Sequence, residues 1–137
     1  MGRVVGAFVV DAAFVLLFAL IGRISHVEGV TLGGVVETAW PFLVGLAAGW
    51  ATAHALRRRW PWGVGDAVPV WVVTVALGLA LRVASGSGGA PWSFALVATL
   101  SLGLFLIGWR CVVAVTAFGV AGLQRLTEDA ARRNVRR

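Results

Sequence analysis

Four long apolar stretches alternate with short polar or glycine-rich segments along the chain. The apolar stretches cover residues 4–22, 34–56, 67–84 and 92–113. Each is close to the length of about 20 residues that a helix needs to cross the hydrocarbon core of a bilayer. Apolar side chains surround each predicted helix instead of forming one stripe, as expected where the outside of a bundle faces lipid. The pattern predicts an all-α, polytopic integral membrane bundle of four transmembrane helices.

The segments between the apolar stretches are short, which favours antiparallel packing of neighbouring helices. We expect one transmembrane domain over residues 1–123 and a basic helical tail over residues 124–137. Asp11 interrupts the first stretch and no small-x-small cleavage site follows it, so we expect a retained helix and not a signal peptide. The sequence VVAVTAFGVAGL after Cys111 stays apolar. It leaves open a short fifth helix, although we favour a longer, tilted fourth helix.

Composition supports a membrane location. Of the 137 residues, 59% are hydrophobic and 13% are charged, whereas soluble domains carry about 25% charged residues. The basic residues are all arginine, and alanine, valine and glycine are abundant, a usage typical of GC-rich bacterial genomes. We therefore expect a multi-pass protein of the bacterial cytoplasmic membrane. The single cysteine, Cys111, excludes an internal disulfide.

Arginines are unevenly distributed between the two sides of the predicted bundle. Arg23 and Arg82 mark one side, and the other side holds Arg3, Arg57, Arg58, Arg59, Arg125, Arg132, Arg133, Arg136 and Arg137. Because arginines collect on the cytoplasmic side of membrane proteins, we expect both termini in the cytoplasm. The tail would then contact anionic membrane lipids, with a specific protein partner as the alternative. Topology explains the net charge of +6, and we expect no nucleic-acid partner.

A set of polar residues falls at the opposite, outer surface of the predicted bundle. The set comes from three helix ends or loops and comprises Arg23, Ser25, His26, Glu37 and Arg82. In one interpretation these groups anchor helix ends and pair with one another. In the other they line a small pocket that opens outward, where the arginines bind an anion and His26 titrates. The sequence leaves both interpretations open.

Two charged residues lie inside the apolar stretches, toward the cytoplasmic side. Asp11 is seven residues into the first stretch, about 10 Å below the inner surface, and Arg110 lies at a comparable depth in the fourth. Charges inside a membrane are costly, so they usually pair or face a cavity. We predict an intramembrane Asp11–Arg110 ion pair that joins the first and last helices. A proton or ion relay is the alternative.

Other motifs carry less chemistry. Gly45 and Gly49 form a GxxxG pattern, which allows close helix packing either inside the bundle or between two copies. His54 is interpreted as an interfacial histidine, because no second His or Cys lies at metal-ligand spacing. Ser25 and His26 are adjacent in sequence, but adjacency alone does not make a catalytic set. We expect no catalytic, cofactor-binding or metal site and no cofactor.

Several of these segments together resemble a known family. The segments IGRISHVEG, TAWPFLVGLAAGW, LGLALRVASGSG and FLIGWR, preceded by Asp11, are similar to small bacterial and archaeal membrane proteins grouped as domain of unknown function family 3054. The resemblance covers about Asp11 to Arg110. Matched positions are Asp11, Gly22, Arg23, Ser25, His26, Trp40, Pro41, Gly49, Arg82, Gly86, Trp109 and Arg110. Ile24 departs from the family, which often has a second basic residue there. The resemblance implies a multi-pass membrane protein and gives no activity.

Two functions are consistent with this sequence, and neither is enzymatic. The first is a transporter or channel-like module for a small solute or anion, with its site near Arg23, His26 and Arg82. Because a four-helix chain has little room for an enclosed path, transport favours a homo-oligomer. The second is an accessory or scaffold subunit of a larger membrane complex, in which the same residues are structural. Membrane lipids are the partners expected in both cases.

Overall fold

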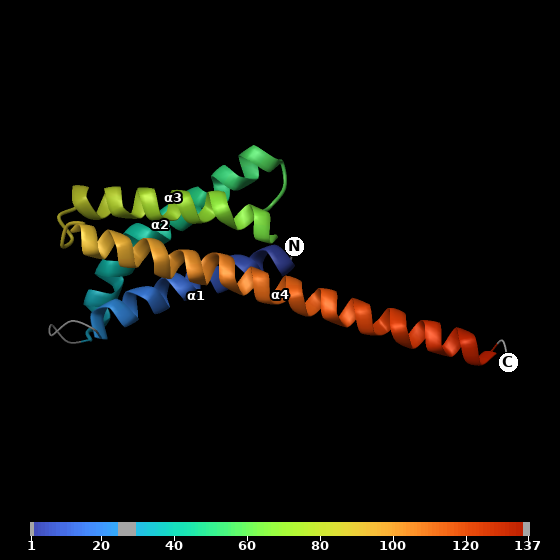
Figure 1. Cartoon of the computed structure of the whole chain (residues 1–137). Coiled ribbons are helices and arrows are strands. Elements are labelled where there is room, and N and C mark those ends of the chain that lie inside the picture. The colour runs from blue at the N-terminus through green and yellow to red at the C-terminus, as the bar shows by residue number, and fades with distance from the viewer. Residues whose placement is uncertain (1, 25–29, 136–137) are drawn as a thin grey trace.

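The computed structural model describes residues 2–24 and 30–135 and contains four helices within them. These are α1 (Gly2–Ile24), α2 (Leu32–Arg57), α3 (Val64–Ala84) and α4 (Trp92–Val135) (Figure 1). The described ranges contain no strand. Each helix is long and apolar enough to cross a membrane. The all-α fold with four candidate spans, predicted from the sequence, is confirmed.

Helix ends are set by local hydrogen bonds that the apolar pattern alone does not show. The hydroxyl of Thr31 accepts a hydrogen bond from the N–H of Gly34 and caps α2. At the other end of α2, Arg58 adopts a left-handed conformation (φ 56°) and its N–H donates to the His54 carbonyl. The carboxylate of Asp66 accepts from the N–H of Gly63, so α3 begins before its apolar stretch.

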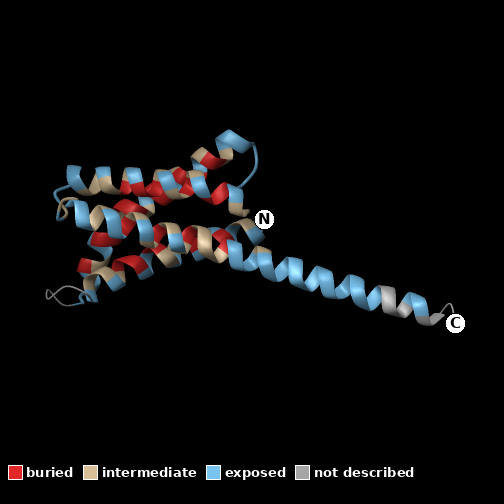
Figure 2. Ribbon diagram, in the orientation of Figure 1, coloured by how far each residue is buried: buried red, intermediate tan, exposed pale blue. Residues whose placement is uncertain are grey.

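The fourth helix is longer than its predicted span. It runs without a break from Trp92 to Val135, 44 residues in all, so the apolar sequence after Cys111 belongs to the same helix and forms no separate fifth one. The C-terminal part of the helix extends past the bundle and projects as a single rod (Figure 1). After Arg110 nearly all described side chains of α4 are exposed (Figure 2), including Val112, Val115 and Phe118.

Helices α2 and α3 approach each other closely through glycine. A Cβ atom on Gly45 would lie 2.6 Å from the carbonyl oxygen of Thr74, and one on Gly49 would lie 2.7 Å from that of Val70. Real side chains do not tolerate such distances, so only glycine fits at both positions. The GxxxG pattern is therefore used inside the bundle.

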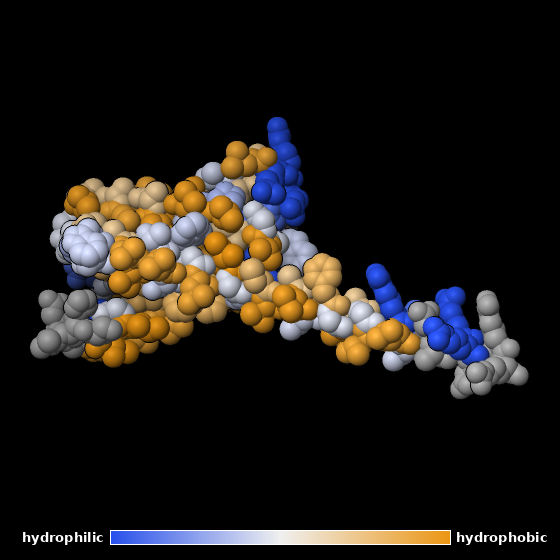
Figure 3. All heavy atoms as spheres, in the orientation of Figure 1, coloured by the Kyte–Doolittle hydropathy of each residue, from blue (hydrophilic) through white to orange (hydrophobic). Residues whose placement is uncertain are grey.

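The interior of the bundle contains apolar side chains and also charged groups. Phe42, Leu46 and Leu102 are fully buried between the helices, and so is Asp11, while Arg110 is 2% exposed. Figure 2 shows the buried residues gathered between the four helices. Apolar side chains instead cover much of the visible outer face, and hydrophilic ones gather near the α2–α3 connection and the far end of α4 (Figure 3). A buried ion pair inside an apolar exterior is the distribution expected of a lipid-facing bundle.

Arginines other than Arg110 and those of the projecting part of α4 are found at both ends of the bundle. At one end, the guanidinium carbon of Arg3 lies 5.8 Å from the centre of the Trp62 ring, which places the start of α1 beside the α2–α3 connection. At the other end, Arg23 closes α1 and Arg82 is in the last turn of α3. The helices thus divide these arginines as the apolar pattern predicts.

Candidate functional site

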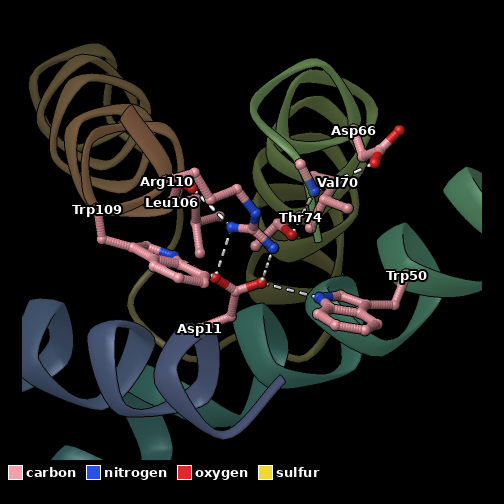
Figure 4. Close-up of polar contacts among 9 residues, drawn as sticks. Asp11, Trp50, Asp66, Val70, Thr74, Leu106, Trp109 and Arg110 are labelled. Atoms are coloured by element: carbon pink, nitrogen blue, oxygen red, sulfur yellow. Dashed lines mark hydrogen bonds and ion pairs between the residues drawn. The ribbon is translucent and has the colours of Figure 1, made fainter. Parts of the chain in front are cut away.

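The first candidate site is a buried cluster around Asp11, here called the Asp11 cluster (Asp11, Trp50, Trp109 and Arg110). Arg110 Nη1 donates to Asp11 Oδ1 and Arg110 Nη2 donates to Asp11 Oδ2, each at 2.8 Å. The residues predicted to pair therefore form a two-pronged salt bridge between α1 and α4 (Figure 4). This parallel arrangement is the strongest that arginine and a carboxylate make.

Two indole groups complete the coordination of the Asp11 carboxylate. Trp109 Nε1 donates to Oδ1 and Trp50 Nε1 donates to Oδ2, both at 2.9 Å. Each carboxylate oxygen thus accepts two hydrogen bonds, from residues on α2 and α4 (Figure 4). Arg110 Nη1 also donates to the Leu106 carbonyl at 2.6 Å. Among these donors and acceptors, the only buried atom without a partner is Arg110 Nε.

This saturation favours a structural role for the Asp11 cluster over a proton relay. A relay carboxylate needs room for an incoming proton donor and an outgoing acceptor, but Asp11 is 0% exposed and already holds four donors. Fixed hydrogen bonds of this kind hold α1, α2 and α4 at one level of the bundle. Trp50 was not singled out from the sequence and Trp109 entered only as a position matched by the family resemblance; neither was predicted to contact Asp11, because indoles at such positions are commonly interfacial anchors. The adjacency of Trp109 to Arg110 was the available signal.

The second candidate site is a cavity of about 910 Å³ at the end of the bundle that contains Arg23 and Arg82. We call it the arginine cavity. It lies among all four helices, and its lining residues are Phe18, Ile21, Gly22, Arg23, Thr38, Arg82, Gly88, Pro91, Ser93, Phe94, Val97, Ser101 and Phe105. Its volume is within the range of small-molecule sites.

The structure brings only part of the predicted outer set into this cavity. Arg23 and Arg82 line it together. Glu37 is on an exposed position of α2 and does not line the cavity, although its charge acts on Arg82. Ser25 and His26 lie outside the described residues. Thr38, one residue after Glu37, lines the cavity and was not identified from the sequence.

Glycines determine where the two arginine side chains lie. A Cβ atom on Gly34 would collide with the guanidinium of Arg23, and one on Gly88 would lie 2.5 Å from Arg82 Nη2. Gly88 also has a φ of +85°, which disfavours other residues. Each guanidinium group therefore packs directly against the backbone of a glycine.

Arg82 is held at one edge of its guanidinium and is available at the other. Its Nε donates to the Gly89 carbonyl at 2.7 Å, and its guanidinium carbon lies 4.3 Å from the centre of the Phe94 ring. No acceptor among the described residues is within hydrogen-bonding distance of its two Nη atoms. A guanidinium fixed in this way presents a planar pair of donors suited to an oxyanion.

The hydroxyl groups of the cavity differ from those elsewhere in the helices. Thr74 and Thr99 donate to the carbonyl four residues earlier, at 2.7 Å each, which is the usual arrangement in apolar helices. Thr38, Ser93 and Ser101 make no hydrogen bond to another described residue. These three hydroxyls are the ones that line the arginine cavity, so they can serve a bound molecule or water.

A third polar group caps the opposite end of the bundle. Asp66 is 1% exposed and accepts a hydrogen bond from Arg59 at 3.0 Å, while Arg57 Nε lies 3.4 Å from the same oxygen. Because Asp66 also caps α3, this group is a structural tie between the α2–α3 connection and its helix. Sequence reasoning treated these arginines only as topology signals and missed Asp66.

Metal binding has no support in the described ranges. No three His, Cys, Asp or Glu side chains lie together there as a metal site requires. The ring of His54 is stacked on Trp60, with centroids 4.3 Å apart. Its interfacial interpretation stays a prediction.

The comparisons with known proteins give a family. No curated protein and no solved structure matches the chain. The model of the family described as "Protein of unknown function (DUF3054)" matches residues 8–113. This range contains the Asp11 cluster and the whole lining of the arginine cavity, and it ends where α4 leaves the bundle. The resemblance inferred from the sequence motifs is confirmed, and the chain belongs to the DUF3054 family.

Proposed function

We propose that the chain is a multi-pass protein of the bacterial cytoplasmic membrane that binds a small anionic solute in the arginine cavity, as a module for its transport. The observation that carries this proposal is the cavity itself, a space of about 910 Å³ with two guanidinium groups in its wall. A charge at the edge of a membrane protein's interior is costly, and Arg82, whose Nη atoms have no acceptor among the described residues, gains from an anion bound in the cavity.

The distribution of arginines supports the membrane orientation in this proposal. The arginine cavity is at the end of the bundle with few arginines, whereas Arg3 and the arginines of the α2–α3 connection are at the other end. By the positive-inside rule the arginine-rich end faces the cytoplasm. The cavity then opens outward, and both termini are cytoplasmic.

Beyond the cavity, the packed core closes the way toward the cytoplasmic side. Leu102 and Leu106 are fully buried on α4, and the saturated Asp11 cluster lies one turn further along. One chain therefore holds a binding site without an open passage. Transport requires either movement of α1 against α4 or a path formed between copies in a homo-oligomer.

Anion binding tests this proposal directly. We would reconstitute the protein in lipid nanodiscs and measure binding of acetate, inorganic phosphate and dodecanoate by calorimetry. At least one of these anions should bind, and Arg82→Gln should weaken binding by about tenfold or more, since a charge-assisted hydrogen bond contributes about 1.5–3 kcal/mol. Arg125→Gln is the matched control, because it removes one arginine from the exposed part of α4.

Two results would contradict anion binding. One is the absence of binding by every anion in the set. The other is equal loss in Arg82→Gln and Arg125→Gln, which would make the effect one of net charge. Where binding is present, uptake of the same anion into proteoliposomes tests transport separately.

The alternative is a non-catalytic accessory subunit of a larger membrane complex, which the projecting part of α4 favours. Its apolar side chains are widely exposed, with Phe118 at 79% and Val115 at 71%. Deleting residues 119–137 distinguishes the two functions. An anion-binding module should keep its affinity, whereas an accessory subunit should lose its association with other membrane proteins while the bundle stays folded.

A further inference from the structure

We propose that the ligand of the arginine cavity is an amphiphile, an oxyanion at the end of an aliphatic chain, bound along the seam between α1 and α4. This inference rests on the proposed anion site and specifies what that site binds. The oxyanion binds at Arg82 and Ser93, and the chain runs away from them along α4.

The cavity is polar at one end and mainly apolar along its length. Arg23, Arg82 and Gly88 are at the end of the bundle, whereas Phe18, Val97 and Phe105 line the part further inside. At 1.5 Å per residue, the lining segment of α4 from Ser93 to Phe105 extends about 18 Å. A small hydrophilic anion would occupy the arginine end alone and leave most of this apolar wall uncovered.

The cavity is open toward the side of the bundle where lipid would lie. Ile21 of α1 and Val97 of α4 both line it, yet they are 47% and 55% exposed on the outer surface. An opening bordered by such side chains allows a chain to enter from the bilayer without crossing water. A site for a soluble ion has no need of an apolar entrance of this kind.

A second hollow extends the same seam. It is an apolar groove of about 470 Å³ between α1 and α4, and its lining includes Phe14, Leu104, Gly108 and Trp109. Phe105 lines both the groove and the arginine cavity, and its ring is stacked on that of Phe14 with centroids 5.2 Å apart. The two hollows therefore form one track from the arginines to the level of the Asp11 cluster, with Phe105 at their junction.

The chemistry at the arginine end selects an oxyanion over a neutral head. The free Nη edge of Arg82 and the hydroxyl of Ser93 are donors with no described partner. A carboxylate or phosphate accepts from both kinds of group, whereas an alcohol head offers one weaker acceptor. If the cavity binds both the charged head and the aliphatic chain of the ligand, its affinity for the ligand should rise with the length of that chain. The expected rise is up to about fourfold for each methylene group buried.

Photolabelling tests the amphiphile directly. The protein would be placed in phosphatidylcholine nanodiscs with a dodecanoate that carries a diazirine near the end of its chain, and the labelled residues identified by mass spectrometry. We expect labels on α1 and α4 near Val97 and Phe105. Unlabelled dodecanoate should compete strongly, dodecanol at least tenfold less well, and acetate or inorganic phosphate at least a hundredfold less well.

Two kinds of variant separate the contribution of the anionic head to binding from that of the aliphatic chain. Arg82→Gln should reduce labelling by about tenfold, and Arg125→Gln should leave it unchanged. Ser101→Phe fills the inner part of the cavity and should abolish labelling there while leaving the arginines in place. If Ser101→Phe does not fold, Val97→Trp narrows the same space from an exposed position and should reduce labelling in the same way.

The pattern of competition shows whether the amphiphile proposal alone or also the anion-binding proposal is wrong. If acetate or phosphate competes as well as dodecanoate and depends on Arg82, anion binding stands and the amphiphile is wrong. If dodecanol competes equally and Arg82→Gln has no effect, the cavity is merely apolar, and both proposals are wrong. Competition by phosphatidylglycerol added to the disc supports the amphiphile and identifies a membrane lipid as its source, whereas competition by dodecanoate alone identifies a free acid.

Discussion

Asp11 and Arg110 are 99 positions apart in the sequence and meet in the middle of the bundle, with both of their N–O pairs at 2.8 Å. Their salt bridge joins the first and last helices, and Trp50 adds a donor from α2 to the same carboxylate. Three of the four helices therefore converge on one buried carboxylate. The position of α1 against α4, on which the arginine cavity depends, follows from this contact.

A double-mutant cycle tests the energetics of this pair. Asp11→Ala leaves Arg110 buried without its counter-ion, which should cost about 3–5 kcal/mol of unfolding free energy. The Asp11→Ala/Arg110→Ala double variant should be milder than the worse single variant, because no buried charge remains. Unfolding in detergent, followed by circular dichroism, gives these values, and Arg125→Ala serves as the control. Strict additivity of the two single effects would show that the residues do not act as partners.

The indole donors provide a second prediction. Trp50→Phe and Trp109→Phe each remove one hydrogen bond to a charged carboxylate, which should cost about 1.5–3 kcal/mol. Trp71→Phe is the matched control, since Trp71 Nε1 donates to the neutral carbonyl of Thr99 at 3.0 Å and the same atoms are removed. We expect each cluster variant to lose about twice as much stability as Trp71→Phe. Equal losses for all three would show that ring packing dominates and the carboxylate contact contributes little.

Some of this structure could be predicted from the sequence because membranes restrict the options. A charge within a long apolar stretch requires a compensating partner. Asp11 and Arg110 interrupt the first and last stretches at similar depth, so their pairing followed from position alone. The first three helices also end within a few residues of their apolar stretches, since polar or glycine-rich segments follow each of them.

Other features could not be predicted because the residues involved have several common roles. Trp50 and Trp109 are indoles near predicted interfaces, where most indoles are anchors. Thr38 and Ser101 line the cavity, but hydroxyls in apolar helices usually bond to their own backbone, so sequence gives no reason to single them out. The length of α4 was left open, because the sequence VVAVTAFGVAGL after Cys111 stays apolar beyond the length of one span.

The glycine contacts between α2 and α3 give a third prediction. Gly45→Ala and Gly49→Ala place a methyl group against a backbone carbonyl that cannot rotate away, so each should cost about 1–3 kcal/mol of stability. Gly6→Ala in α1 meets nothing within 4 Å and should be neutral or slightly stabilising, since alanine favours helix. Thermal unfolding in detergent measures all three. A Gly45→Ala protein of normal stability that no longer forms an oligomer would place the glycine pair between copies instead.

Asp66 gives a fourth prediction, because it combines a helix cap with two arginine contacts. Asp66→Ala removes both the acceptor of the Gly63 N–H and the charge that Arg57 and Arg59 contact. Both arginines are about half exposed, with side-chain values of 45% and 55%, so solvent screens them and the pairs add little. Most of the loss, about 1 kcal/mol, should come from the cap on Gly63. Arg59→Gln should therefore be nearly silent, and a large effect of that variant would assign the stability to the ion pairs.

The membrane orientation is the last prediction, and the outward direction of the arginine cavity depends on it. Arg3 at the start of α1 lies against Trp62 of the α2–α3 connection, which also carries arginines, so the positive-inside rule places this end and both termini in the cytoplasm. Reporter fusions at Met1 and Arg137 should then be active only as cytoplasmic reporters, and an insertion in the turn from Ser85 to Ala90 should be active only as an external one. Replacing Arg57, Arg58 and Arg59 together with glutamine should weaken this preference, because the charge bias falls while the helices remain. If the two termini are found on opposite sides, an odd number of spans crosses the membrane and the arginine cavity cannot open outward as proposed. If both termini are external, the cavity faces the cytoplasm, and its anion comes from inside the cell.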